Sequence, residues 1–508
     1  MKPLFLSLSL FICCFIQAQS PAENLRKYDA YGRRLRSGFV YDAGDARLQG
    51  SWLPMECRRV SADGRVTAYW ADGTWWLGHY VAVLATEYRR LQLEKDTPAA
   101  AAALADLQCA LAVYDRLDCE AERCWGADTS TNAFYLRDDV PADFRDRFGV
   151  DEIHSDYARK CGDSESTANG PSQDQAWASY LGLALVRALV DDEAVKEQAS
   201  RVAARLVRAM QHTDRSGKES WQVVNPVTGA ILQPSTDIQW LKYAHAQAYK
   251  VLTGKACTFG DATAASSRQL WQLIQQNFTL DKRGHYNWYG VLALSAVINE
   301  KPALSGTTCN WLADKCSELS EMRPDLQQPL MFPHLPLINY LLYPEQKAKL
   351  LPDTLYENIL NAAPAEGAHH HVWEGPSGRS AAPWHTLSLF CPWHEAENSD
   401  YNMLDYMLLY NLYRLVYAPE MPVGMPLAEK TAVSVRPNPA GEKVRLYFPE
   451  CTDIRVCRLY GVDGRLLRQL EISAGELELD VSDLPAGFYC LQFTDGKRLL
   501  DVCKFVKK

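Results

Sequence analysis

Apolar residues recur at the spacing of α-helices through most of this chain, from residue 72 to residue 417. Side chains three and four positions apart share one face of a helix, whereas strands require alternation, and almost no alternating stretch occurs in this range. The body of the chain is therefore predicted to be all-α. Helices are predicted at 73–93, 98–117, 173–190, 193–211, 238–252, 262–277, 285–298, 327–342, 345–360 and 400–417.

The predicted helices are of two kinds. Those that begin near residues 73, 173, 238, 285, 330 and 401 are rich in aromatic and small residues nearly all round, which indicates burial on several sides. The others carry charge along one face, as the stretch 193–206 does. This alternation is typical of an inner ring of helices wrapped by an outer ring. In this architecture, though in no motif, the chain resembles the (α/α)6 toroids of many glycoside hydrolases and polysaccharide lyases. An α-solenoid fits the same pattern.

The segment 431–508 has a different character, because short alternating stretches replace the helical spacing. It contains the motifs PNPA from Pro437, LYGVDGR from Leu459 and DVSDLPAGFY from Asp480, followed by a lysine-rich end. On these motifs the tail resembles the type A sorting domain of the type IX secretion system. The resemblance implies a small all-β sandwich, contact with the secretion machinery, and export across an outer membrane. We therefore expect a secreted or cell-surface protein whose tail is either removed or kept as an anchor.

The start of the chain has the features of a secretory signal. Lys2 supplies positive charge, residues 4–16 form an apolar stretch too short to span a membrane, and cleavage is expected between Ala18 and Gln19. Lipidation at Cys13 is not favoured, because a bulky isoleucine precedes it. The predicted organisation is a signal peptide at 1–18, an N-terminal extension with loops at 19–71, the toroid-like domain at 72–420, a linker at 421–430 and the sorting domain at 431–508.

Charge and motif content argue against several classes of function. The chain has 53 Lys and Arg against 62 Asp and Glu, and this net charge of -9 argues against nucleic acid or an anionic membrane as partner. The sequence has no Gly-x-Ser-x-Gly turn, no phosphate-binding glycine loop and no dinucleotide fingerprint. We therefore predict no nucleotide and no cofactor.

The cysteine content fits an exported protein. The chain has 15 cysteines, of which Cys13 and Cys14 lie in the signal, and the others fit passage through an oxidising compartment. Sequence does not determine how they pair. The pairs considered are Cys309 with Cys316, and Cys119 with either Cys124 or Cys109.

If the body is a toroid, the N-terminal ends of its inner helices meet at one mouth. Glycoside hydrolysis requires paired carboxylates in a cleft, with aromatic rings to stack on sugars. Asp174 ranks first as a catalytic or substrate-orienting acid, because it lies in the first turn of an aromatic helix for which Ser172 already supplies a cap. Its partner is Asp237 or Asp72. The predicted substrate-binding residues at this mouth are Gln173, Gln175, Trp177, Trp240, His285, Trp288, His334 and Asp400. Helix capping is an alternative explanation for Asp72, Asp237 and Asp400.

The segment 364–398 is too long for a simple connection and is rich in tryptophan and histidine. Its aromatic content favours a sugar-binding lid that includes Trp373 and His385. We predict no metal site there, because the three adjacent histidines at 369–371 rarely converge on one ion.

Other acidic residues are better explained by structural roles. Asp138 and Asp139 are candidates for calcium or substrate, but capping and loop-ordering ion pairs explain them better. Glu87 lies in mid-helix and is expected to pair with a nearby basic residue.

The leading hypothesis is a carbohydrate-active hydrolase outside the cell that uses acidic residues in an aromatic cleft. A polysaccharide lyase is a variant in which His285, Tyr286 or His385 abstracts a proton next to a uronate, although the acidic residues disfavour an anionic substrate. The alternative outside the enzymes is a non-catalytic surface protein that binds glycan or peptide. Sequence alone does not decide whether the body is an enzyme.

Overall fold

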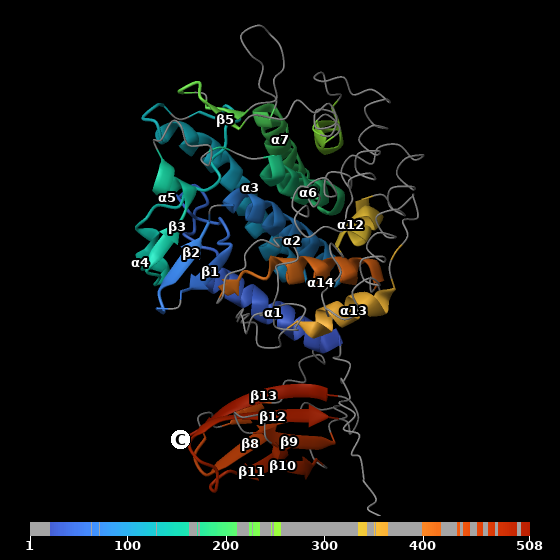
Figure 1. The fold of residues 1–508 in the computed structure, drawn as a ribbon. Coiled ribbons are helices and arrows are strands. Elements are labelled where there is room, and N and C mark those ends of the chain that lie inside the picture. Colours follow the sequence, from blue (N-terminus) through green and yellow to red (C-terminus); the bar gives the residue numbers. More distant parts are fainter. Residues whose placement is uncertain are drawn as a thin grey trace, which may run out of the picture. The chain divides into compact units, whose positions relative to one another are not determined.

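The 508-residue chain divides into two compact units, Met1–Pro419 and Glu420–Lys508, which we call the body and the tail unit (Figure 1). The structure is a computed structural model. It describes residues 21–61, 63–70, 72–128, 130–161, 170, 173–210, 223–225, 227–233, 245, 248–255, 334–342, 350, 352–363, 399–417, 434–436, 440–447, 455–460, 466–472, 476–494 and 499–508.

Helices dominate the described part of the body, which confirms the predicted class. They are α1 (Pro21–Gly38), α2 (Gly73–Leu93), α3 (Thr97–Arg123), α4 (Phe144–Phe148), α5 (Asp156–Lys160), α6 (Gln173–Leu189), α7 (Glu193–Met210), α12 (His334–Leu342), α13 (Asp353–Ala362) and α14 (Leu404–Tyr417). The predicted ranges 262–277 and 285–298 lie outside the described residues. The segment 19–71 contains helix α1 as well as loops, and sequence analysis missed this helix.

Helices α2 and α6 run parallel and are packed closely enough to require glycine on both. A Cβ on Gly78 would lie 2.5 Å from the backbone of Ala178, and a Cβ on Gly182 would lie 2.3 Å from the carbonyl oxygen of Gly78. Nearer the helix starts, Thr74 Oγ1 donates to Gln175 Oε1 at 2.7 Å. Contacting positions advance together along both helices, so the two N-terminal ends lie side by side.

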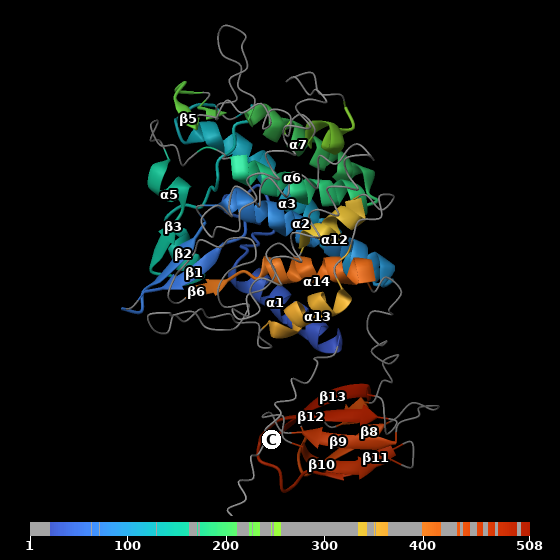
Figure 2. The ribbon, with the colours of Figure 1, turned by 45° about the vertical axis from the view of Figure 1, so that its right-hand side comes forward.

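A small sheet brings the start of α14 to the same end. Its strands are β1 (Cys57–Val60), β2 (Val66–Tyr69), β3 (Glu152–His154) and β6 (Ser399–Tyr401), in the order β3-β2-β1-β6. Strands β2 and β6 are both antiparallel to β1, so they run in one direction, and they lead into α2 and α14 respectively (Figure 2). His334, at the start of α12, places its Nε2 2.9 Å from the carbonyl oxygen of Asp405. The N-terminal ends of α2, α6, α12 and α14 therefore gather at one end of the body.

We call the helices α2, α6, α12 and α14 the inner layer, and other helices pack outside it. Tyr31 contacts Tyr406 and Tyr28 contacts Tyr410, with ring centroids 4.9 and 5.0 Å apart, so α1 runs antiparallel to α14. Helix α3 returns along α2 after a tight turn, in which the side chain of Asp96 caps α3 by accepting from the backbone N–H of Ala99 at 3.1 Å. Charge on one face of α7 fits its place beside α6 and α3.

The prediction of an all-α body is wrong in detail, because short strands occur at 152–154, 223–224, 231–233 and 399–401. Each has two or three residues, too few to show alternation, and each is held by a partner strand. Strand β4 (Val223–Val224) pairs with β5 (Ile231–Gln233), whereas β3 and β6 pair with strands far away in sequence. The range predicted as a helix from residue 400 begins in β6, and α14 starts at Leu404.

The regular elements of the tail unit are all strands among its described residues. They are β7 (Ser434–Arg436), β8 (Lys443–Tyr447), β9 (Val456–Tyr460), β10 (Leu466–Glu471), β11 (Glu476–Asp480), β12 (Gly487–Thr494) and β13 (Leu499–Lys507). They form two sheets, ordered β10-β9-β12-β13 and β11-β8-β7. Alternation in β8 buries Val444 and Leu446, which share a hydrophobic core with Leu459 and Leu491 of the other sheet.

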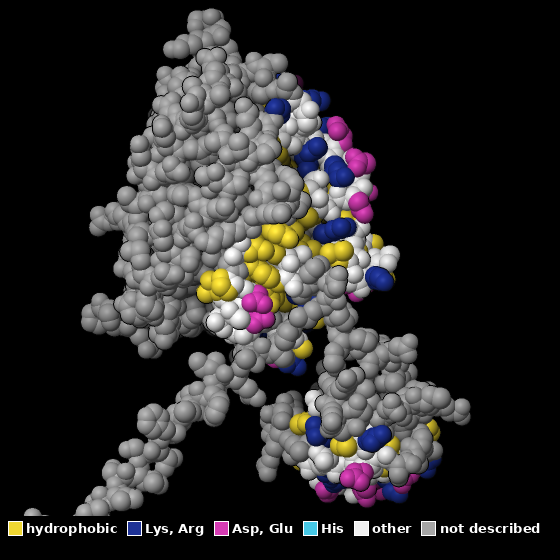
Figure 3. Space-filling model, turned by 90° about the vertical axis from the view of Figure 1, so that its right-hand side faces the viewer, with side chains coloured by type: hydrophobic (Ala, Val, Ile, Leu, Met, Phe, Trp, Pro, Cys, Tyr) yellow, Lys and Arg dark blue, Asp and Glu magenta, His cyan; other side chains and the backbone are white. Residues whose placement is uncertain are grey.

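The outward positions of the tail unit carry charge of both signs. Lys443 and Arg445 both pair with Glu478, at 2.6 and 3.1 Å, across the strands β8 and β11. Basic and acidic side chains are interspersed on the face drawn in Figure 3. Mixed charge of this kind keeps a small β unit soluble.

Candidate functional site

The structure describes the predicted site residues to different extents. The side chains of Asp72, Gln175, Trp177 and His334 are described. For Gln173, Asp174 and Asp400 only the backbone is described: the first two begin α6, and Asp400 pairs with Arg58 in the sheet. The other predicted positions, Asp237, Trp240, His285, Tyr286, Trp288, Trp373 and His385, lie outside the described residues.

Asp72 occupies the N-cap position of α2, but its side chain makes no capping hydrogen bond. Its Oδ1 instead accepts from Gln175 Nε2 at 3.0 Å and lies 3.7 Å from Nη1 of Arg137. The side chain is 25% exposed. Helix capping therefore does not account for the side chain of Asp72, which is held as a partly exposed carboxylate between α2 and α6.

Gln175 positions this carboxylate. The residue is buried, and its amide is used at both ends, donating to Asp72 and accepting from Thr74 Oγ1. These bonds join two parallel helices and fix the rotamer of the amide. Gln175 therefore fixes the position of the Asp72 carboxylate.

Arg137 is a site residue that sequence analysis missed. Its Nε donates to the carbonyl oxygen of Gly170 at 2.9 Å, while Nη1 lies 3.7 Å from Asp72 and 3.8 Å from Asp156. We call Asp72, Thr74, Arg137, Asp156 and Gln175 the Asp72 cluster. Arg137 belongs to no recognisable motif, and its partners are distant in sequence, so the only signal was its place next to two acidic residues.

Asp138 and Asp139 have structural roles, as predicted. Buried Asp138 accepts from the hydroxyl of Ser155, from Val140 N–H at 3.1 Å and from Asp156 N–H at 2.8 Å. Burial raises the pKa of Asp138 to about 7, although these hydrogen bonds oppose the shift. Asp139 forms a buried ion pair with Arg116. Both carboxylates therefore order the segment that carries Arg137.

A disulfide between Cys124 and Cys161, which are 37 positions apart, closes this segment. The predicted pairings of Cys119 are wrong, since Cys109 and Cys119 are free thiols. Both lie within α3, and ten residues of helix rise about 15 Å, beyond the roughly 7 Å Cα separation that a disulfide allows. Cys124 ends the same helix and reaches the returning loop. Cys309 and Cys316 lie outside the described residues.

The described aromatic and histidine side chains near the cluster are buried. Trp177 is 3% exposed, and His334 and His79 are fully buried. Burial lowers the pKa of His334 to about 4 and that of His79 to about 3, so both rings are neutral at neutral pH. These groups contribute to the core of the inner layer. Within the described ranges, no group of three or more His, Cys, Asp or Glu side chains is arranged to hold a metal ion.

The Asp72 cluster provides one oriented, partly exposed carboxylate at the N-terminal ends of two parallel helices. Backbone N–H groups and the helix dipole favour negative charge at such an end. The backbone of Asp174 belongs to the first turn of α6, directly before Gln175. Two acidic residues thus start neighbouring helices, an arrangement suited to acid–base chemistry.

Comparison with known families identifies the domain type of the tail unit. Residues 434–508 match the family described as the secretion system C-terminal sorting domain. The tail unit carries a type IX sorting domain. The predicted resemblance and the predicted localisation are confirmed: the sorting domain indicates secretion to the cell surface or the extracellular space and implies interaction with the type IX machinery. No curated protein and no solved structure matches the chain.

Proposed function

We propose that the body is a glycoside hydrolase that acts outside the cell after export by the sorting domain. The observation that carries this proposal is the side chain of Asp72, which leaves the capping position unused and is held instead by Gln175 and Arg137. Export supports a substrate found outside the cell, and polysaccharides are abundant there. No cofactor is required by this chemistry.

The proposed architecture is an (α/α)6 toroid followed by a β-sandwich. The common N-terminal end of α2, α6, α12 and α14 supports an inner ring, and α1, which runs antiparallel to α14, supports an outer one. The core shared by the two sheets of the sorting domain supports the sandwich. The proposed organisation retains a signal peptide at 1–18, the toroid at 72–420, a linker at 421–430 and the sandwich at 431–508.

The proposed mechanism assigns complementary roles to two carboxyl groups. The guanidinium of Arg137 and the amide of Gln175 favour negative charge on Asp72, which suits a base or a nucleophile. Asp174 then protonates the leaving oxygen, and Asp237 is the second candidate for the partner role. Trp240, Trp288 and Trp373, with Gln173, His285, His385 and Asp400, remain the proposed contacts to the sugar, whereas Trp177 and His334 are buried in the core.

Burial of Trp177 and His334 removes two of the predicted sugar contacts, and a second candidate is a protein that binds peptide or glycan without turning it over. Rings packed in the core are unavailable for stacking on a sugar. This candidate predicts binding without release of product. A lyase would need His285, Tyr286 or His385 as the base, and none of these lies among the described residues.

The test is reducing-sugar release from a broad glycan panel by the wild type and by Asp174→Asn and Asp72→Asn variants. Loss of a general acid or base lowers the rate by about 10²–10⁴-fold, so each variant should lose turnover while keeping glycan binding. Asp45→Asn, which changes a half-exposed acid paired with Arg47, is the matched control. Full activity in both site variants overturns the mechanism. Binding without product in the wild type supports the non-catalytic candidate.

A further inference from the structure

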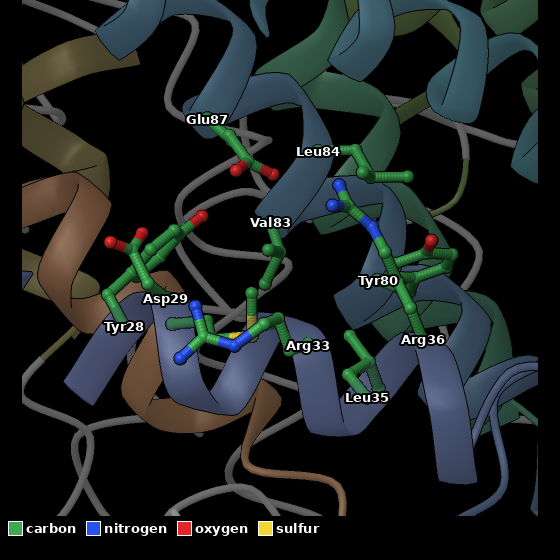
Figure 4. A pocket seen from close by; sticks show the side chains of 11 residues that line it. Tyr28, Asp29, Arg33, Leu35, Arg36, Tyr80, Val83, Leu84 and Glu87 are labelled. Atoms are coloured by element: carbon green, nitrogen blue, oxygen red, sulfur yellow. The ribbon is translucent and has the colours of Figure 1, made fainter. Parts of the chain in front are cut away.

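A cavity of about 210 Å³ lies between α1, α2 and α14, away from the Asp72 cluster. Its polar lining comes from Tyr28, Asp29, Arg33 and Arg36 of α1 and from Tyr80 and Glu87 of α2. In Figure 4 the Glu87 carboxylate points from α2 toward α1, and Arg36 extends from α1 toward α2. Glu87 follows Asp72 by 15 positions, which is about 22 Å along a helix. The two sites are therefore separate.

Glu87 places a largely buried carboxylate at this cavity. Its side chain is 13% exposed and lies 3.9 Å from Arg90, which confirms the predicted local pairing. Tyr28, which also lines the cavity, hydrogen-bonds to Glu87, but this bond and the long ion pair leave further acceptor capacity on the carboxylate. Glu87 is therefore able to accept hydrogen bonds from a ligand.

The hydroxyl of Tyr80 is a second, independent indication. Tyr80 is 1% exposed, and its Oη has no hydrogen-bond partner among the residues that the structure describes. A buried hydroxyl without a partner is costly and rare in folded proteins, so it is expected to bond to a bound molecule or ordered solvent. Tyr80 lines the same cavity as Glu87.

The charges around the cavity balance. Asp29 and Glu87 are matched in number by Arg33 and Arg36. The balance holds when the partners behind them are counted, Asp106 at 3.2 Å from Arg36 and Arg90 at 3.9 Å from Glu87. The wall therefore favours neither a cation nor an anion. The same groups offer both acceptors and donors, while Met407 and other apolar side chains supply a hydrophobic surface. A neutral molecule with several hydroxyl groups on a ring satisfies all of these groups at once.

We propose that the cavity between α1 and α2 binds one neutral polyhydroxylated ring, such as a single sugar residue. A cavity of about 150 Å³ is enough to hold one benzene ring, so a volume of 210 Å³ suits one ring rather than a chain of rings. The ligand donates hydrogen bonds to the Glu87 carboxylate and accepts them from the Tyr80 hydroxyl and the Arg36 guanidinium. It does not depend on catalysis at the Asp72 cluster.

The test uses the full-length protein and methyl glycosides of neutral hexoses and pentoses, with binding followed by saturation-transfer NMR and titration. Tyr80→Phe removes only the unpartnered hydroxyl and Glu87→Gln removes the charge. Each is expected to weaken binding by about 10-fold or more, the usual effect of losing a buried hydrogen bond to a ligand. Tyr114→Phe is the matched control, because the hydroxyl of Tyr114 bonds to Ser179 outside the cavity.

Folding and site identity are checked separately. Tyr80→Phe should keep the melting temperature, so that lost binding is not lost folding. Asp72→Asn should bind the glycoside as the wild type does, which distinguishes this site from the catalytic proposal. Equal binding by the wild type and both cavity variants overturns the proposal, as does the absence of binding by any glycoside. Preferential binding of glycine or inorganic phosphate, used as charged probes, also overturns it.

Discussion

The buried ion pair between Arg116 and Asp139 gives the sharpest test of the packing around the candidate site. Arg116 Nε donates to Asp139 Oδ2 at 2.6 Å and Nη2 donates to Oδ1 at 3.1 Å, with side-chain exposures of 4% and 0%. The third nitrogen of the guanidinium donates to the carbonyl oxygen of Ser51 at 2.7 Å. The pair thus joins α3, the segment after Arg137 and the N-terminal loop.

Asp139→Asn keeps the shape of the side chain but removes the charge that compensates Arg116. The guanidinium then remains buried beside an amide that directs donors toward it. Removing one partner of a buried pair costs about 3–5 kcal/mol, so we expect a loss of this size in the free energy of unfolding of the body. The N–H of Gly50, which donates to Asp139 Oδ1 at 3.2 Å, keeps an acceptor in the variant, so the guanidinium accounts for the loss.

Tryptophan fluorescence in urea measures this loss in the body alone, because all 14 tryptophans precede Pro419. The matched control is Asp45→Asn, which removes an acid paired with Arg47 at 2.7 Å in a half-exposed position. This variant should unfold at nearly the same urea concentration as the wild type, since exposed pairs contribute little.

The double variant Arg116→Met with Asp139→Leu removes both charges and is expected to recover part of the loss. The reasoning is refuted if Asp139→Asn loses less than about 1 kcal/mol, or no more than Asp45→Asn does. Either result would mean that the buried guanidinium of Arg116 does not cause the loss of stability.

Other predictions concern the bridge, the histidines and the helix contact. Cys124→Ser opens a loop of 37 positions and should cost about 4 kcal/mol by the chain-entropy relation, measured by the same urea unfolding. The pKa of His334 falls from 6.5 in the unfolded chain to about 4 in the folded protein. Between these two pH values the unfolded chain binds a proton at His334 and the folded protein does not. The free energy of unfolding of the wild type therefore declines as pH falls from 6.5. At pH 5 this proton accounts for about 2 kcal/mol, and His334→Asn should decline by that much less over the same range. Gly182→Ala pushes a Cβ to 2.3 Å from the backbone oxygen of Gly78 and should cost about 3 kcal/mol, whereas Gly32→Ala, whose Cβ would meet only Met407 at 3.6 Å, should be neutral or stabilising. Equal melting temperatures for the two glycine variants would contradict the close approach of α2 and α6.

The inner helices could be predicted because their composition is unusual along their whole length. The ranges predicted at 73–93 and 173–190 match α2 and α6 to within one residue at each end. Helix α1 was missed because its sequence is rich in charge, and its tyrosines become buried only against α14. Tertiary packing determines that helix more than its own pattern does.

The candidate site was only partly predictable. The acidic residues at helix starts are visible in sequence, since helices can be predicted and their first turns follow. The side chain of Asp72 turns to Arg137 instead of capping its helix, and these two residues are 65 positions apart. No local sequence pattern encodes this contact. The unpartnered hydroxyl of Tyr80 is likewise a property of three packed helices, and in sequence it is one aromatic residue among many.

The disulfide between Cys124 and Cys161 connects the candidate site with the export of the protein, because it forms only outside the cytoplasm. In the reducing cytoplasm the thiols stay apart, and only noncovalent contacts hold the segment that places Arg137 next to Asp72. After the chain leaves the cytoplasm, oxidation forms the disulfide and holds that segment covalently. Among the described residues this disulfide is the covalent link that joins the two ends of the segment carrying Arg137, and it forms only after the chain leaves the cytoplasm.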